Sequence, residues 1–191
     1  MRCKAGMLGA NRENGWDIST AVYVQSFSVA SQESTPTAMF ISADGRHMYV
    51  AGDSENVNQY ALSSAWDIST ASYVQSLNIP SSGDAAPYAV FFDTLGEKMF
   101  VAQTVSAFVA AISEYSLSSA WDISTGSYVQ NFNVFSEDGL PYGLSFKPDG
   151  QRMYVLGRNN DEVHEYSLSA AWDVSTASYV QSFSVASEDL V

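Results

Sequence analysis

The sequence is poor in the residues that make disulfides and metal centres. It has a single cysteine, Cys3, so no disulfide can form within the chain. Its two histidines, His47 and His164, are too few for a three-histidine metal site. No apolar run approaches the roughly 18 residues that a membrane-spanning helix needs, and residues 1–15 lack the apolar centre of a signal peptide. These absences exclude a disulfide framework, a three-histidine site and a helical membrane span.

Positive charge is scarce as well. There are 8 Lys and Arg against 21 Asp and Glu, which gives a net charge of −13. A chain this acidic is repelled by phosphate backbones, so we expect no nucleic-acid partner. Apolar residues make up 46% of the chain and aromatic residues 13%, which is typical of a packed globular protein. Most of the acidic side chains are expected on a solvated surface.

The chain is rich in one phrase of 14 residues that is written four times. The copies read WDISTAVYVQSFSV, WDISTASYVQSLNI, WDISTGSYVQNFNV and WDVSTASYVQSFSV, and they start at Trp16, Trp66, Trp121 and Trp172. Their spacings of 50, 55 and 51 residues are typical of one supersecondary unit copied in tandem. The repeat therefore predicts an architecture before it predicts any chemistry.

Each complete unit predicts four short β-strands. The first three are expected at 36–41, 47–51 and 57–62, at 87–92, 98–102 and 112–117, and at 141–146, 152–156 and 163–168. The fourth is the Tyr-Val-Gln stretch of the repeated phrase, where alternate residues face opposite sides. A tight turn is expected between the first two strands at Asp44-Gly45 and Asp149-Gly150, and the middle unit departs from this pattern at 93–96.

Four strands in about 50 residues are typical of a β-propeller blade. A β-solenoid is the alternative, but its repeats are usually shorter. We therefore predict an all-β fold with three complete four-stranded antiparallel blades and one extra outer strand. The predicted division is a non-repeat segment at 1–15, an orphan outer strand and linker at 16–35, and blades at 36–86, 87–140 and 141–191.

Three blades do not match the four to eight that propellers use to close a ring. We expect a propeller that is part of a longer array or is completed by another copy, and self-association through exposed blade faces or strand edges. In a two-chain ring, the orphan strand at 22–29 would compete with 179–185 for one place. One of these two strands would have to be displaced or added as a fifth strand.

The Trp-Asp start of each phrase has two interpretations. In the structural one, Asp, Ser and Thr accept hydrogen bonds from nearby backbone N–H groups and fix a turn, while Trp buries its ring. In the functional one, each Asp belongs to a repeated ligand or Ca²⁺ site. We favour the structural interpretation because a turn is needed in every blade. The residues concerned are Trp16, Asp17, Trp66, Asp67, Trp121, Asp122, Trp172 and Asp173.

The segments at 40–50 and 146–155 share Asp-Gly followed by Met-Tyr-Val, and this pattern resembles the YVTN and lactonase-like β-propeller repeats. The full unit, with Tyr-x-Leu-Ser-x-Ala-Trp-Asp, is similar to repeat proteins of marine bacteria and their viruses. The resemblance implies a propeller fold and lactonase-like hydrolysis as the enzyme alternative. It does not assign catalytic positions on this chain.

Chemistry in such a fold is expected on the loops between the fourth and first strands and between the second and third. Those loops carry carboxylates that could hold Ca²⁺ through oxygen ligands: Glu33, Asp53, Glu55, Asp84, Glu137, Asp138, Asp161 and Glu162. Ordinary loop polarity is the alternative. His164 lies in a third strand with no nucleophile motif to accompany it, which favours a satisfied or exposed strand histidine over a catalytic one.

The sequence thus favours a non-enzymatic propeller module for binding or scaffolding, with no cofactor required and Ca²⁺ as an open option. A protein or a glycan is the expected ligand class, and an extracellular or virion location is favoured. The alternative is a fragment of a lactonase-like or metal-assisted hydrolase. Near-identical repeats favour the first hypothesis because an active site needs asymmetry among blades.

Overall fold

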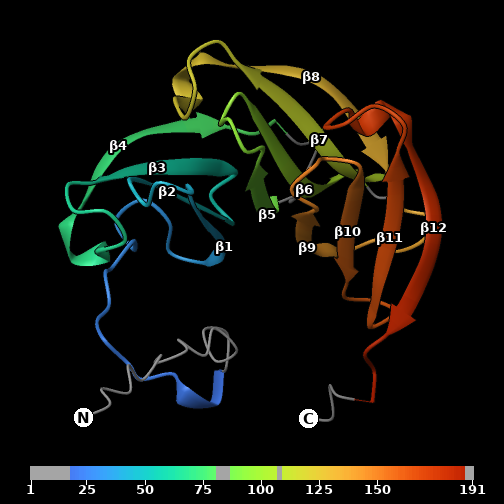
Figure 1. Cartoon of the computed structure of the whole chain (residues 1–191), viewed down its shortest axis with the longest axis horizontal. Coiled ribbons are helices and arrows are strands. Elements are labelled where there is room, and N and C mark those ends of the chain that lie inside the picture. The colour runs from blue at the N-terminus through green and yellow to red at the C-terminus, as the bar shows by residue number, and fades with distance from the viewer. Residues whose placement is uncertain (1–17, 81–86, 107–108, 188–191) are drawn as a thin grey trace, which may run out of the picture.

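The computed structural model describes residues 18–80, 87–106 and 109–187, which form an arc of three four-stranded sheets (Figure 1). The first blade contains β1 (Pro36–Ile41), β2 (His47–Gly52), β3 (Asn56–Leu62) and β4 (Ala71–Asn78). The second contains β5 (Pro87–Phe92), β6 (Lys98–Ser106), β7 (Val109–Leu117) and β8 (Gly126–Asn133). The third contains β9 (Pro141–Phe146), β10 (Arg152–Gly157), β11 (Glu162–Leu168) and β12 (Ala177–Ser184).

Every blade is an antiparallel meander in which each strand pairs with the next along the chain. The first strands β1, β5 and β9 lie side by side at the inner edge of the arc, and the fourth strands β4, β8 and β12 form its outer rim (Figure 1). The predicted all-β, blade-like architecture is confirmed. All nine predicted inner strands are present, but β6 extends four residues past its predicted end at 102 and β7 begins three residues before its predicted start at 112. No helix among the described residues is long and apolar enough to cross a membrane.

The turn between the first two strands is the same in all three blades. Gly45, Gly96 and Gly150 have φ of 71°, 72° and 72°, in the left-handed region that glycine adopts without strain. A Cβ at any of the three would overlap the tryptophan ring of its own blade. Asp-Thr-Leu-Gly in the second blade therefore builds the same turn as Asp-Gly in the others, because only the glycine is required.

The hydrophobic core lies between the blades. We call the side of a blade that faces the preceding blade its incoming face, and the opposite side its outgoing face. One cluster joins the outgoing face of the first blade to the incoming face of the second, and includes Tyr49, Ile79, Met99 and Ile123, none of them exposed to solvent. A second cluster joins blades two and three in the same way.

Residues 22–29, expected as an orphan outer strand, pair with no strand in the described part of the chain. The segment instead lies along the incoming face of the first blade, where Phe27 packs edge-on against Tyr60 with ring centroids 5.8 Å apart. Its earlier residues Val22, Tyr23 and Val24 are 82%, 79% and 83% exposed. A strand needs a neighbour to satisfy its backbone groups, and the described residues provide none here.

Candidate functional site

The Trp-Asp phrase opens a short 3₁₀ turn in each blade: η3 (Ile68–Thr70), η4 (Ile123–Thr125) and η5 (Val174–Thr176). The Asp67 carboxylate caps the first of them and accepts hydrogen bonds from the Ser69 N–H at 3.0 Å and the Ser69 hydroxyl at 2.7 Å. Asp122 and Asp173 make the equivalent bonds in the other blades. These bonds favour the ionised form, and the serine hydroxyl is the main cause of the lowered pKa of all three carboxyls.

The tryptophan before each aspartate has an unusual backbone. Trp66, Trp121 and Trp172 have φ of 65°, 65° and 61°, a region that costs a bulky residue about 1–3 kcal/mol. The backbone N–H of each tryptophan donates to the backbone carbonyl of the turn glycine in its own blade. The left-handed backbone recurs in all three described copies and belongs to the turn itself.

The same phrase also bonds to the preceding blade. The carbonyl oxygen of Trp121 accepts from the Tyr49 hydroxyl at 2.6 Å and from the Gln59 amide at 2.8 Å. Asp122 accepts from the Gln75 amide at 2.6 Å, and that amide also donates to Gln59 Oε1 at 2.8 Å. Because burial raises the pKa of Tyr49, its hydroxyl remains a donor.

Gln59 completes this set through a backbone contact, since its Oε1 also accepts from the Ile123 N–H at 3.2 Å. One turn therefore presents two acceptors and one donor to the preceding blade: the tryptophan carbonyl, the aspartate carboxylate and the N–H of the following residue. We call this group of three atoms the turn triad. It joins residues 47 to 72 positions apart in the sequence.

Blades two and three use the same triad with charged partners. The Trp172 carbonyl accepts from Lys98 Nζ at 2.7 Å, and Asp173 accepts from the Gln130 amide at 2.7 Å. Glu114, which is 2% exposed, accepts from the Gln130 amide at 2.9 Å and pairs with Lys98 at 2.7 Å. Its Oε2 also accepts from the Val174 N–H at 3.2 Å.

Sequence reasoning missed the partners of the turn triad. Gln75 and Gln130 occupy one position of the repeated phrase, while Gln59 and Glu114 occupy one position of the third strand. Their recurrence at fixed positions was visible in the sequence. What was not visible is that these side chains reach across to the next blade.

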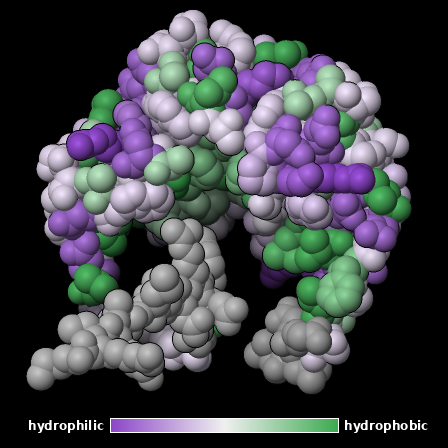
Figure 2. All heavy atoms as spheres, viewed as in Figure 1, coloured by the Kyte–Doolittle hydropathy of each residue, from purple (hydrophilic) through white to green (hydrophobic). Residues whose placement is uncertain are grey.

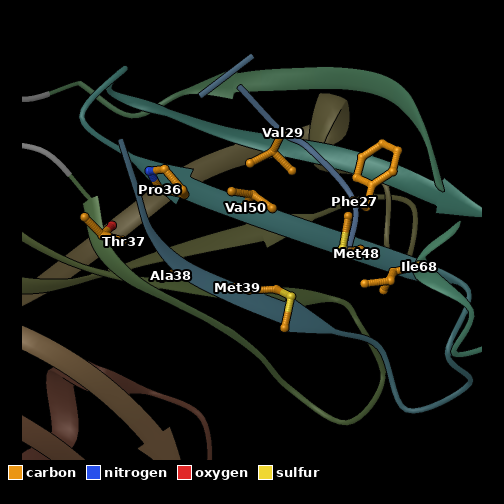
Figure 3. Close-up of a pocket in the computed structure, with 9 residues that line it drawn as sticks. All are labelled: Phe27, Val29, Pro36, Thr37, Ala38, Met39, Met48, Val50 and Ile68. Atoms are coloured by element: carbon orange, nitrogen blue, oxygen red, sulfur yellow. The ribbon is translucent and has the colours of Figure 1, made fainter. Parts of the chain in front are cut away.

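The incoming face of the first blade is the least covered of the three. Trp66 is 59% exposed, whereas Trp121 and Trp172 are half-buried. An apolar groove of about 320 Å³ runs along this face (Figure 3). Phe27 and Val29 lie over β2 on one side of the groove, and Met39 projects from β1 on the other (Figure 3).

The outgoing face of the third blade is also open. Phe183 is 70% exposed and Leu156 is 41% exposed. Beside Phe183 lies a smaller cavity of about 200 Å³, and Glu165 and Gln181 also line it. Figure 2 shows hydrophobic residues gathered at the lower end of this blade.

The acidic loop residues do not converge on one point. Glu33 is 1% exposed and accepts from the Thr35 and Ser54 N–H groups at 2.8 and 3.0 Å. Asp138 accepts from Leu140 and Asn160 N–H at 2.7 and 3.0 Å in the same way. Each carboxylate thus bridges two loops of its own blade.

Three of the remaining candidates neighbour these two along the chain: Asp53 and Glu55 flank Ser54, whose N–H bonds to Glu33, and Glu137 precedes Asp138. Asp53 is exposed, and Glu55 and Asp161 have left-handed backbones with φ of 57° and 50°. Glu137 accepts from the Ser136 hydroxyl at 2.7 Å. Glu162 Oε2 lies 3.9 Å from His164 Nδ1. The described residues contain no group of three or more His, Cys, Asp or Glu side chains that could hold a metal. Asp84, Trp16 and Asp17 lie outside the described residues.

His164 differs from the satisfied or exposed strand histidine that was expected. It is 3% exposed, and neither ring nitrogen has a hydrogen-bond partner in the described part of the protein. The corresponding positions of the other blades, Asn58 and Ser113, are also buried and polar. This position of the third strand therefore carries a buried polar side chain in every blade.

No protein-family model and no curated protein matches this sequence. Among solved structures, the chain is similar to a putative 6-phosphogluconolactonase from Bacteroides fragilis, with a TM-score of 0.58 and 12% identity over 78% of this chain and 39% of that one. It is also similar to the Cps50 (Swd1) β-propeller domain of Myceliophteria thermophila, with a TM-score of 0.50 and 17% identity over 78% and 43%. Hydrazine synthase of Kuenenia stuttgartiensis gives 0.53 and 17% over 84% and 39%.

These likenesses concern the fold alone, since every identity is below 25%. The chain spans about two fifths of the length of each structure, with 39%, 43% and 39% covered. Three four-stranded antiparallel blades arranged in an arc, and similar to known propellers, make this chain a β-propeller module.

Proposed function

We propose that the chain is a non-enzymatic binding or scaffolding module that works through the open faces at the two ends of its blade arc. One observation carries the proposal: the face that a whole blade covers in blades two and three is covered only by the segment at 21–29 in blade one, where Trp66 remains 59% exposed and an apolar groove is left. Exposed apolar surface of this kind is typical of interaction sites. The resemblance of the repeats to the YVTN type supports a propeller module and does not by itself separate binding from hydrolysis.

The polar groups also favour a structural role. Glu33 and Asp138 are engaged with backbone N–H groups, and Glu114 is engaged with Lys98 and the next blade. A carboxylate that already accepts several hydrogen bonds is a poor general base. The repeated residues thus hold the blades together and leave the end faces for partners.

The test is the molar mass of the full chain in solution. Multi-angle light scattering and sedimentation velocity from about 1 to 100 μM are expected to show reversible association. Addition of high salt should strengthen it, because the surface charge is −13 and the faces are apolar. A single-chain mass of 20.7 kDa at every concentration would contradict self-association.

A lactonase-like or metal-assisted hydrolase is the second candidate. It is favoured by the fold similarity to the putative 6-phosphogluconolactonase and by the unpartnered ring nitrogens of buried His164. Hydrolysis of 6-phosphogluconolactone, abolished by His164→Asn, would support it. Calorimetric titration with CaCl₂ tests the metal-assisted form, and its expected signal is a saturable heat that Asp138→Asn removes.

A further inference from the structure

We infer that the outgoing face of the third blade binds the incoming face of the first blade in a second copy of this chain, head to tail. The inference rests on the proposed scaffolding role and names its partner. Each face carries one half of a contact that the structure already makes twice, between blades one and two and between blades two and three.

The first blade presents a turn triad with two of its three atoms unused. Asp67 accepts from the Gln25 amide at 2.8 Å, as Asp122 accepts from Gln75. No described residue bonds to the Trp66 carbonyl or to the Ile68 N–H. At the two closed interfaces the equivalent atoms are all bonded to the preceding blade.

The third blade presents the matching set of partners. Arg152, Glu165 and Gln181 occupy the positions of Lys98, Glu114 and Gln130 in the second blade. The Gln181 amide donates to Glu165 Oε2 at 2.8 Å, and Arg152 Nε lies 3.5 Å from Glu165 Oε1. These three side chains are already arranged as their counterparts are at the closed interface, where the equivalent amide bond is 2.9 Å.

The apolar groups match as well. Phe132 of the second blade packs edge-on against Tyr166 of the third, with centroids 5.5 Å apart. Phe27 occupies the equivalent place against Tyr60 at 5.8 Å, and Phe183 is the equivalent residue on the open face of the third blade. A second copy would therefore place Phe183 where Phe27 lies now.

Docking requires the segment at 21–29 to leave this face. A docked third blade would replace this lone segment with a complete sheet, and we expect that sheet to bury Trp66 and Met39, which are now 59% and 61% exposed. The contact is heterologous, since different patches meet, and it closes only if the rotation brings the remaining two faces together. Two copies would supply six blades, which lies within the four to eight that propellers use.

The experiment uses two full-chain variants that each damage one face. Met39→Arg alters the incoming face and Phe183→Arg the outgoing face, at side chains that are 61% and 70% exposed and so are not needed for folding. Leu95→Arg, at 63% exposure in a turn of the second blade, is the matched control. Circular dichroism and thermal melts check that all three fold.

Light scattering is expected to give an associated wild type and Leu95→Arg, and a single-chain mass for either face variant alone. An equimolar mixture of the two face variants should form a one-to-one dimer, because it still contains one intact face of each kind. Association that survives in both variants, or that only one of them abolishes, would overturn the head-to-tail contact while leaving self-association in place. A wild type that stays monomeric would overturn both.

Discussion

The incoming faces of the first and second blades carry almost the same residues but differ in what covers them. Trp66 is 59% exposed, while Trp121 is half-buried and stacks with Phe40 of the first blade at 6.4 Å. The aspartate turns are the same in both, with carboxylate–N–H distances of 3.0 Å. The turn is therefore a local property of the phrase. In the first blade Gln25 supplies the contact to Asp67, whereas the tryptophan carbonyl and the following N–H are bonded only where a preceding blade is present.

This difference separates two roles within one phrase. Asp67 and Asp122 each fix their own turn, but the Trp121 carbonyl and the Ile123 N–H also bond to the first blade. A substitution in the first blade should therefore report the local role and, at Asp67, the bond from Gln25. The same substitution in the second or third blade should report the local role together with the interface.

The largest expected difference concerns tryptophan. Trp121→Ala should lower the free energy of unfolding by about 3–5 kcal/mol, because it removes a ring packed between two blades. Trp66→Ala should cost about 1 kcal/mol or less, since most of that ring already faces solvent. Urea unfolding followed by circular dichroism measures both. Equal losses would show that the tryptophan serves its own turn and not the interface.

The next difference concerns the charged pair between blades two and three. Lys98→Met leaves buried Glu114 without its cation and the Trp172 carbonyl without a donor, at an expected cost of about 3 kcal/mol. Arg152→Met removes the equivalent pair from the open face, where the side chains are 39% and 20% exposed, and should cost about 0–1 kcal/mol. Chemical denaturation of the two variants under identical conditions makes the comparison. A small effect of Lys98→Met would mean that the Gln130 amide and the Val174 N–H hold Glu114 adequately without the lysine.

A smaller effect is expected from pH. Hydrogen bonds, chiefly from Ser124 and Ser175, hold the pKa of Asp122 and Asp173 below the usual 3.8. A carboxyl with a lowered folded pKa adds stability that is complete above its unfolded pKa and is lost as pH falls through the folded value. The urea concentration at the unfolding midpoint should therefore decrease as the pH is lowered from about 5 to about 3. Replacing both residues with Asn should make this part of the pH dependence shallower.

The strands could be predicted from the sequence because their signals are local. The first strands of all three blades, β1, β5 and β9, begin and end where alternation and the flanking turns place them. The aspartate turn could be read in the same way, since its donor and acceptor are two residues apart. The recurrence of the 14-residue phrase also predicted the number of blades and their order along the chain.

The cross-blade contacts could not be predicted because they join residues far apart in sequence. Gln75 reaches Asp122 across 47 positions, and nothing in Tyr-Val-Gln states which neighbour the amide will meet. Residues 22–29 were expected as a strand because their sequence closely resembles that of β4, but strand formation also needs an edge to pair with. His164 was misjudged for a related reason: its burial depends on how the finished sheet packs.

The central claim is that the repeated phrase joins neighbouring blades through its aspartate and the glutamine of the preceding blade. A double-mutant cycle with Gln130→Ala and Asp173→Ala tests it most directly, since these side chains meet at 2.7 Å across the interface. We expect the two losses in unfolding free energy to be non-additive by about 1 kcal/mol. Strict additivity would contradict the account and leave the aspartate with its turn alone.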